Sequence, residues 1–462
     1  MQQCWFTRAM VAWLVLILPL VLLIVLSARG TSVMLLAPLM ALVAALLATQ
    51  PLLATMTQVF MPALGGFVTE FFLLFLLGAL FGKVMAHSGA AEALAQAVVR
   101  RLGAEHAIAT TVLACGLLTY GGVSLFVVAF TVYPLARALF AQAGTPGRLI
   151  PAAIALGAFT FTMTALPGTP AIQNAIPMPY FGTDLYAAPG LGIIAAIIMA
   201  GGGLMILNFI GRREGVEGTG ENDSTVREDA PPAWQALLPI VLVLALNLLL
   251  SRAIFPAMDF SFLQEEQWGG VDPATLTGLW AVLTSLAGAI LLSLALFRRQ
   301  MSEPMAALGQ GAQDSLMPLM NTASLVGFGA VMAALPAFDV IRRAIEDMPG
   351  GAAESLAVAA SVLAGITGSA SGGMSIALDA LGADYLQRAQ AEGLDPALLH
   401  RVTALATGGL DALPHNGAVI TLLTIGGLTH RQAYGPVFLV AVAVPVLALV
   451  VVLGLARVFG TF

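Results

Sequence analysis

Apolar segments long enough to cross a lipid bilayer recur along almost the whole chain, and this pattern limits the fold more than any other feature. A helix of about 20 apolar residues spans a hydrocarbon core of roughly 30 Å. Only 10% of the residues are charged, too few to cover the surface of a water-soluble protein of 462 residues. Because backbone groups in lipid must be hydrogen-bonded within their own segment, we expect an all-α polytopic membrane protein.

Eight full spans are expected from these segments. They are residues 9–27, 32–49, 67–87, 189–210, 233–252, 275–297, 315–335 and 435–457. The first resembles a signal peptide, but a second span follows at once, so we interpret it as a retained helix. Short basic clusters, such as Arg100-Arg101 and Arg212-Arg213, should face the cytoplasm. All these clusters can face the cytoplasm only if 107–140 and 355–386 are re-entrant hairpins, and both chain ends then lie outside. We expect the protein in the inner (plasma) membrane of a bacterium.

The remaining composition narrows the expected partners and cofactors. The net charge of -6 comes from acidic residues clustered in loops, so nucleic acid is not expected as a partner. Cys4 and Cys115 cannot supply a disulfide framework or a cysteine metal site, and no His-Glu-x-x-His motif is present. We therefore expect a lipid-embedded protein with no metal and no cofactor.

An internal repeat becomes visible when the chain is compared with itself. Residues 81–86 align with 328–333, 121–124 with 368–371, and 165–171 with 412–418, all at the same offset of 247 residues. Three matches in one register exceed what chance gives in apolar sequence, and the charge pattern orients the two halves oppositely. We therefore predict two inverted repeats, 1–211 and 233–462, joined by a hydrophilic cytoplasmic linker at 212–232.

Two glycine- and hydroxyl-rich turns are expected at the ends of the hairpins. We call residues 119–124 the first tip and residues 367–373 the second tip. Glycine permits a tight turn there, and hydroxyls can bind backbone groups or a ligand. Helix packing through small residues is the alternative. The predicted substrate-binding residues of the tips are Tyr120, Gly121, Gly122, Ser124, Thr367, Ser369, Ser371 and Gly372.

Two proline-containing motifs are expected to interrupt the helices at 150–178 and 400–426. We call residues 165–174 the first break motif and residues 408–417 the second break motif. Proline removes a backbone donor, and unwound backbone at membrane depth lines a protein-covered or water-filled cavity. A plain proline kink is the alternative. The predicted substrate-binding residues here are Gly168, Thr169, Gln173, Asn174, His415 and Asn416.

The second break motif also carries two titratable residues. Asp411 and His415 lie four positions apart, within one helical turn, and could take up and release a proton during transport. Alternatively, they cap or hydrogen-bond the broken helix. The two tips and the two break motifs contain no lysine or arginine, which favours a monocarboxylate bound by hydroxyls, amides and helix N-termini. Proton coupling is expected in preference to sodium coupling.

The two break motifs resemble signature stretches of the gluconate permease (GntP) family, within the ion transporter superfamily. The resemblance rests on residues 168–177 and 413–423, with support from Phe81-Gly82-Lys83 and 88–91, and extends from about residue 67 to the end. It implies cation-coupled symport of gluconate-like hydroxy acids or related carboxylates. It also implies a homodimer, with a mobile transport domain that moves as an elevator against a scaffold.

The first tip departs from the superfamily pattern. Tyr120-Gly121-Gly122 stands where related transporters often have Ser-Asn-Thr, so sodium sites are not carried over. Two other functions stay open. Ser371 and His415 could be the nucleophile and base of an intramembrane protease, although Ser369 breaks the usual Gly-x-Ser-Gly pattern and the first half would be unused. An anion channel is the other alternative.

Overall fold

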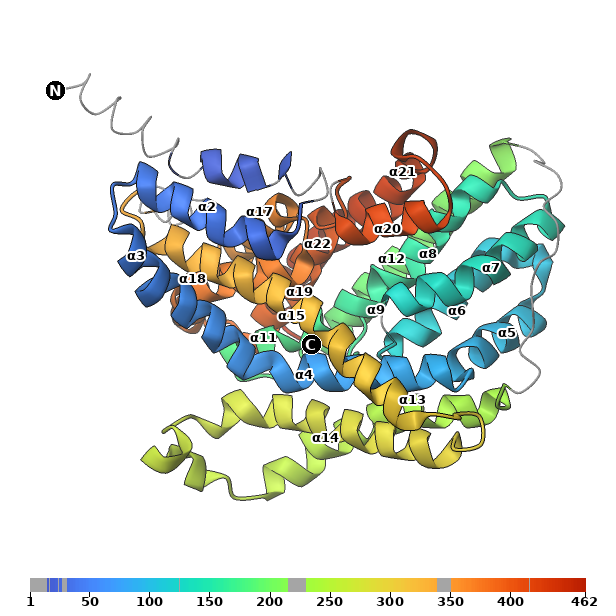
Figure 1. The fold of residues 1–462 in the computed structure, drawn as a ribbon, viewed down its shortest axis with the longest axis horizontal. Helices are drawn as coiled ribbons and strands as arrows, with labels where there is room; N and C mark the ends of the chain where they lie inside the picture. Colours follow the sequence, from blue (N-terminus) through green and yellow to red (C-terminus); the bar gives the residue numbers. More distant parts are fainter. Residues whose placement is uncertain are drawn as a thin grey trace.

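Figure 1 shows the fold in a computed structural model of the chain. The structure describes Val15 and residues 17–23, 25–26, 31–123, 125–214, 230–338, 350–414 and 416–462. Every regular element in these ranges is a helix, which confirms the predicted all-α class.

Seven helical segments of the described chain are long and apolar enough to cross a membrane. They are Leu52–His87, Gly147–Thr164, Pro189–Arg213, Ala233–Ala257, Pro273–Leu296, Pro304–Ala334 and His430–Phe459. Six of them overlap the six spans predicted beyond residue 60, which confirms a multi-pass membrane protein.

The two spans predicted at the start of the chain are not among these seven segments. In place of 32–49 there is α2 (Val33–Leu47), with 15 residues. That helix is about 22 Å long, short of the hydrocarbon core. Thr49 adopts a φ of 55° and Pro51 follows, so the helix cannot continue to the predicted end. Within the span predicted at 9–27, residues 9–14, 16, 24 and 27 lie outside the described residues.

Two long helices, α4 (Met61–His87) and α15 (Pro304–Ala334), lie side by side across the middle of the molecule (Figure 1). Lys83 of α4 forms an ion pair with Asp314 of α15, with a distance of 2.7 Å from Nζ to Oδ2. The helix pair α13 (Ala233–Leu249) and α14 (Pro273–Leu296) runs alongside, and α2 packs on α15. Between α13 and α14, four short 3₁₀ or π turns occupy most of the connecting segment.

Both predicted hairpin segments are helix–turn–helix units. The first consists of α6 (Ala107–Tyr120) and α7 (Leu125–Ala143), and the second of α17 (Ala352–Thr367) and α18 (Ala370–Ala391). The second is packed so closely that a Cβ on Gly373 would lie 2.3 Å from the backbone nitrogen of Ala364. Only glycine fits at that contact.

The chain is non-helical at both predicted interruptions. In the first half, α8 (Ile150–Ala158) and α9 (Phe161–Thr164) end before the prolines, and α10 (Ile172–Ala175) and α11 (Pro177–Phe181) follow them. In the second half, α19 (Pro396–Leu410) ends before Pro414 and α20 (Gly417–Ile425) follows. A further interruption, between α8 and α9, was not predicted.

The remaining helices complete the two halves. They are α3 (Leu52–Thr55), α5 (Ala90–Leu102), α12 (Pro189–Glu214), α21 (His430–Phe438) and α22 (Val444–Phe459). Helix α12 packs against α22 and α8, so the ends of the two halves lie together. Most of the predicted linker, residues 215–229, lies outside the described residues, between α12 and α13.

Candidate functional site

The first tip rests directly on the first break motif. The Tyr120 hydroxyl donates a hydrogen bond of 2.8 Å to the carbonyl of Pro167. Gly122 has a φ of 89°, and a Cβ there would approach Pro170 to 3.1 Å, so glycine is required. Gly121 faces Ile240 of α13. Ser124 lies outside the described residues.

The second tip is connected to the second break motif in a similar way. Asn416 donates from Nδ2 to the carbonyl of Gly368 at 2.9 Å, and its Oδ1 accepts from the Val419 N–H at 2.9 Å. The same side chain therefore holds the tip and caps the start of α20. His415 lies outside the described residues.

Hydroxyl groups of the second tip stabilise its turn. Ser369 caps α18 by accepting from the Gly372 N–H at 3.1 Å, and Thr367 donates to the carbonyl of Leu363 at 2.9 Å. Ser371 Oγ lies 3.4 Å from the hydroxyls of both Ser369 and Thr322, the latter on α15. Two weak contacts leave this hydroxyl adaptable enough to bind a ligand.

Asn174 and Gly168 hold the first break motif in place. Asn174 is fully buried and donates from Nδ2 to the carbonyls of Thr169 at 3.1 Å and Leu185 at 3.0 Å. The Gly168 N–H also donates to the Leu185 carbonyl, at 2.9 Å. Thr169 is fully buried, and its hydroxyl accepts from the Ala171 N–H at 3.4 Å. These groups shape the loop around the break.

Gln173 differs from its neighbours in the first break motif. Its Oε1 is buried and has no hydrogen-bond partner among the described residues, and the same holds for Thr119 Oγ1 at the first tip. An unpaired buried polar atom is costly unless a ligand or solvent satisfies it. These two atoms are the strongest structural indication of a ligand near the first tip and first break motif.

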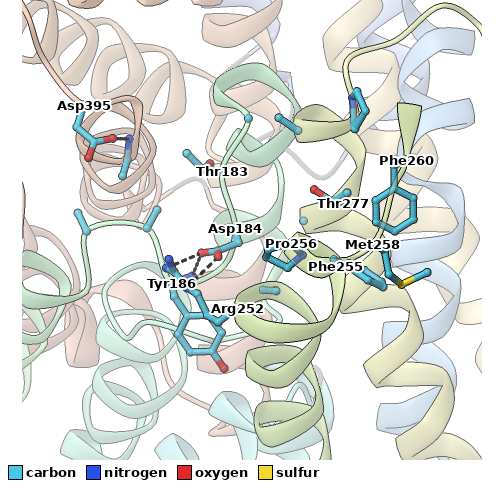
Figure 2. A pocket seen from close by; sticks show the side chains of 18 of the residues that line it. Thr183, Asp184, Tyr186, Arg252, Phe255, Pro256, Met258, Phe260, Thr277 and Asp395 are labelled. Carbon is cyan, nitrogen blue, oxygen red and sulfur yellow. Dashed lines mark hydrogen bonds and ion pairs between the residues drawn. The ribbon is translucent and has the colours of Figure 1, made fainter. Parts of the chain in front are cut away.

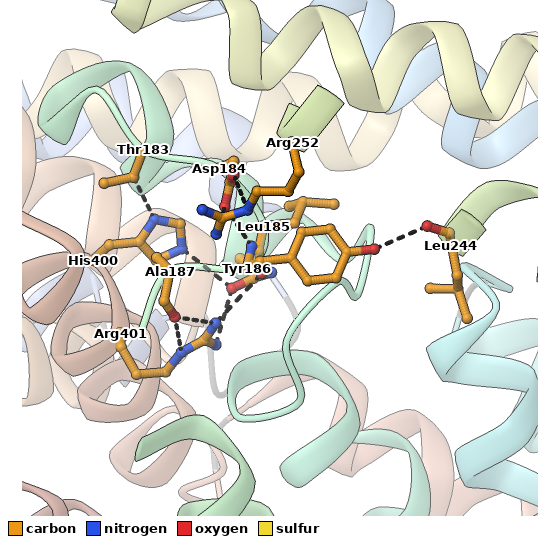
Figure 3. Close-up of polar contacts among 10 residues, drawn as sticks. Thr183, Asp184, Leu185, Tyr186, Ala187, Leu244, Arg252, His400 and Arg401 are labelled. Atoms are coloured by element: carbon orange, nitrogen blue, oxygen red, sulfur yellow. Dashed lines mark hydrogen bonds and ion pairs between the residues drawn. The ribbon is translucent and has the colours of Figure 1, made fainter. Parts of the chain in front are cut away.

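Two buried ionisable residues on α19, His400 and Arg401, were not predicted as site residues from the sequence (Figure 3). Arg401 donates from Nε and Nη2 to the carbonyl of Ala187, at 3.1 and 2.9 Å. Its Nη1 donates to the Thr164 carbonyl and to Asn174 Oδ1, both at 3.0 Å. One arginine thus joins α19, in the second half, to the loops around the first break motif.

The positive charge of Arg401 is solvated almost entirely by neutral groups. Its hydrogen-bond acceptors are backbone carbonyls and one amide oxygen. Asp184 interacts with it electrostatically but forms its ion pair with Arg252. His400 contacts Thr183 at 2.6 Å and Asn174 at 3.2 Å. A buried arginine in a membrane protein is itself a functional signal, and Arg401 lies just before the second break motif.

Asp411 lies at the C-terminal end of α19, beside the second break motif. It is the residue that follows the last helical position, and its carboxylate interacts with the backbone of Ala412. The second break motif touches the end of α9 nearby, since a Cβ on Gly408 would lie 2.7 Å from Thr164, the residue before the first break motif. Among the described residues, each tip is bonded to the break motif of its own half, and Arg401 and Gly408 provide two of the contacts between the halves.

A second acidic residue lies on the second hairpin. Tyr180 of α11 donates a hydrogen bond to Asp379 of α18, and Glu70 of α4 interacts electrostatically with the same carboxylate. This cluster brings together three elements from different parts of the chain, away from the tips.

A cavity of about 770 Å³ lies on one side of the loop that follows α11 (Figure 2). The Asp184–Arg252 ion pair, with 3.3 Å between Oδ2 and Nε, lies in its wall. Tyr186 also lines it, and its hydroxyl donates to the Leu244 carbonyl of α13 at 2.9 Å. Neither the predicted substrate-binding residues nor Arg401 line this cavity.

Comparison with known proteins supplies independent information. The family model described as GntP family permease matches residues 9–410. An uncharacterized transporter of Bacillus subtilis strain 168, YxjC, is 42% identical over 449 residues, which cover 92% of this chain and 94% of the relative. The crystal structure of the Alcanivorax borkumensis YdaH transporter is similar in fold, with a TM-score of 0.56 at 17% identity, covering 86% of this chain and 88% of that one.

Proposed function

The chain belongs to the GntP family of permeases and is a multi-pass membrane transporter rather than an enzyme, and we propose that it imports a small organic anion by cation-coupled symport. The proposed substrate is a gluconate-like hydroxy acid or a related monocarboxylate. The observation that carries this proposal is the arrangement of two hairpin tips on two interrupted helices, with the charge of Arg401 buried between them.

The anion preference follows from charge and backbone geometry. Helix α20, which restarts after the second break, directs backbone N–H groups and partial positive charge toward the second break motif. Arg401 adds a full positive charge behind the first break motif, and its neutral partners leave that charge available to stabilise an anion at a distance. Unpaired Gln173 Oε1 could accept a hydrogen bond from a substrate hydroxyl.

The proposed two-repeat architecture is supported by the element boundaries. Shifted by 247 residues, α4 becomes 308–334, within α15, and α6 becomes 354–367, within α17. Likewise α7 becomes 372–390, within α18, and α8 becomes 397–405, within α19. Four helices in one register support a duplicated fold, and we propose that the halves are inverted in the membrane.

We propose an elevator mechanism in a homodimer of the bacterial plasma membrane. The scaffold would contain α2, α4, α13, α14 and α15, which pack on one another. The transport domain would contain the two hairpins and the two interrupted helices. Between these groups the Asp184–Arg252 pair and the Tyr186–Leu244 bond are polar contacts that must break if the groups slide.

Coupling is proposed to involve Asp411, with H⁺ favoured over Na⁺. Asp411 adjoins the interrupted backbone and lies where the halves meet, so a change in its protonation would alter the charge beside the substrate. His415 remains part of this proposal on sequence grounds alone.

A ligand screen tests the proposed substrate class. The melting temperature of the purified protein would be measured with a panel of hydroxy acids, other monocarboxylates and their neutral amides, at two pH values, with and without sodium. We expect at least one monocarboxylate to raise the melting temperature more than its amide, and more at the lower pH. Stabilisation by amides and carboxylates alike would contradict an anion site, and stabilisation that requires sodium would replace H⁺ with Na⁺.

A further inference from the structure

His400 has a fully buried imidazole ring, and both of its nitrogens are hydrogen-bonded (Figure 3). Nε2 lies 3.2 Å from Oδ1 of Asn174, on α10, and Nδ1 lies 2.6 Å from the hydroxyl of Thr183, in the loop after α11. These two partners are 226 and 217 positions away in the sequence, in the first half of the chain. The proposed coupling and anion binding do not use this ring.

The hydrogen bonds of Asn174 determine which nitrogen of His400 carries hydrogen. Asn174 Nδ2 faces two backbone carbonyls, which only accept, so this end of the amide is the donor. The other end is therefore the oxygen, and it accepts from Nη1 of Arg401 at 3.0 Å. Because an amide oxygen cannot donate, Nε2 of His400 carries hydrogen, and in the neutral ring Nδ1 accepts from the Thr183 hydroxyl.

Thr183 is itself held by neighbouring helices. Its carbonyl packs against α14 so closely that a Cβ on Gly278 would lie 2.4 Å from this oxygen. Its N–H donates to the carbonyl of Met178, on α11, at 3.2 Å. The hydrogen bonds from Thr183 through His400 to Asn174 therefore connect an anchored loop to the first break motif.

Asn174 is the neighbour of Gln173 on α10. Oε1 of Gln173 is the buried oxygen that has no hydrogen-bond partner among the described residues. Helix α10 has four residues, too few for its own backbone hydrogen bonds to fix its direction, so contacts from outside must do so. It packs on α19, where the Asn174 side chain is bonded to His400 and Arg401. The imidazole thus helps to determine where the Gln173 oxygen points.

We propose that His400 is a positioning residue for substrate selection, which holds Asn174, and with it α10, so that Gln173 Oε1 accepts a hydrogen bond from a substrate hydroxyl. This inference rests on the proposed function and narrows it to anions that carry a hydroxyl group. The site then prefers a hydroxy acid to the same acid without the hydroxyl, because the latter leaves the buried oxygen unpaired. Loss of His400 changes this preference and leaves the requirement for a negative charge.

The preference can be measured with the full chain in detergent. Two pairs of acids serve as probes, 3-hydroxybutyrate with butyrate and D-gluconate with hexanoate, and the melting temperature during titration gives each Kd. In the wild type we expect at least one hydroxy acid to bind about tenfold or more tightly than its partner. Equal binding within both pairs, or none, would overturn the proposed hydroxy-acid substrate and the inference with it.

Variants then separate positioning from general stability. H400L removes both ring nitrogens and should reduce the preference for the hydroxy acid about tenfold, by weakening the binding of that acid. H400Q keeps a donor near the place of Nε2 and should retain the preference within about threefold. The matched control is T403V, on the same helix, where a buried hydroxyl donates to the Leu399 carbonyl of that helix at 2.7 Å. Its preference should equal that of the wild type.

Two further measurements apply if H400L does not fold. T183V removes the partner of Nδ1 and should lower the preference severalfold. Nitrogen NMR of protein labelled in its histidine rings, with H400Q to assign the signal, should show hydrogen on Nε2 of His400. Wild-type discrimination that persists unchanged in H400L or T183V would overturn the positioning role and leave the proposed substrate class intact. A ring with hydrogen on Nδ1 alone would also overturn it.

Discussion

At the scale of single residues, the side chains near the breaks divide into those that fix the backbone and those that remain available to a ligand. Asn174 and Asn416 use their amides to hold loops and tips. Gln173 Oε1 is buried without a partner among the described residues, and Ser371 makes only weak contacts. Both asparagines were predicted to bind substrate, but their side chains mainly hold the backbone of the loops and tips in place.

Asp411 is the residue on which coupling most depends. We expect Asp411→Asn to abolish accumulation of the substrate against a gradient while leaving substrate exchange, because exchange needs no net proton movement. Counterflow and gradient-driven uptake in proteoliposomes measure the two activities. Asp395→Asn, on the same helix, is the control, since asparagine also caps the start of α19 where Asp395 accepts from Ala397 at 2.8 Å. Undiminished gradient-driven uptake by Asp411→Asn would remove this residue from the coupling mechanism.

Arg401 should be the most stabilising cation of the described chain. Replacing it with glutamine would strand the carbonyls of Thr164 and Ala187 inside the protein, at a cost on the order of 3 kcal/mol or more. Unfolding of the detergent-solubilised protein measures this change. Arg431→Gln, at an exposed position of α21, should alter stability by less than about 0.5 kcal/mol. If the two variants were equally stable, the buried network would not hold the halves together.

At the scale of elements, hydropathy and proline predicted more than polar motifs did. Spans beyond residue 60 were predictable because lipid demands long apolar helices, and the helices end around Pro167 and Pro414 because proline lacks a donor. The span predicted at 32–49 is longer than helix α2, because the backbone turn at Thr49 that ends this helix cannot be seen in a hydropathy pattern. The ion pair of Lys83 could not be predicted, because its partner Asp314 is 231 positions away in the sequence.

The role of Arg401 was missed for a related reason. Only the tips and the break motifs were predicted to bind substrate, and Arg401 lies seven residues before the second break motif. Most of its hydrogen-bond acceptors are backbone carbonyls, and because every residue has a carbonyl, no sequence pattern indicates which ones an arginine will bind. Buried charge within a span was the one signal that could have identified it.

Close packing within the second hairpin gives an element-scale prediction. Gly373→Ala would force a methyl group to 2.3 Å from the backbone of Ala364, so α17 and α18 must separate. We expect a loss of stability of about 1–3 kcal/mol, measured by thermal unfolding. Gly454→Ala, in α22, is the matched control, because its Cβ would meet nothing within 4 Å, and helix propensity makes it neutral or stabilising. Equal stability of both variants would show that the hairpin tolerates separation.

At the scale of the whole molecule, the account requires one group of helices to move against another. A short thiol cross-linker joining cysteines at positions 184 and 252 should block transport, because the native ion pair there connects the two proposed groups. Cysteines at positions 83 and 314 form the control, since that pair lies within the proposed scaffold. The background should lack Cys4 and Cys115. Transport that survives complete cross-linking of 184 to 252 would contradict sliding at this contact.

The most direct test of the central claim is the flux of a monocarboxylate into proteoliposomes that contain only this protein. With an acid identified by the ligand screen, we predict uptake that saturates with concentration and rises above equilibrium when an inward proton gradient is imposed. Flux that never saturates and follows only the anion's own gradient would identify a channel and contradict the account.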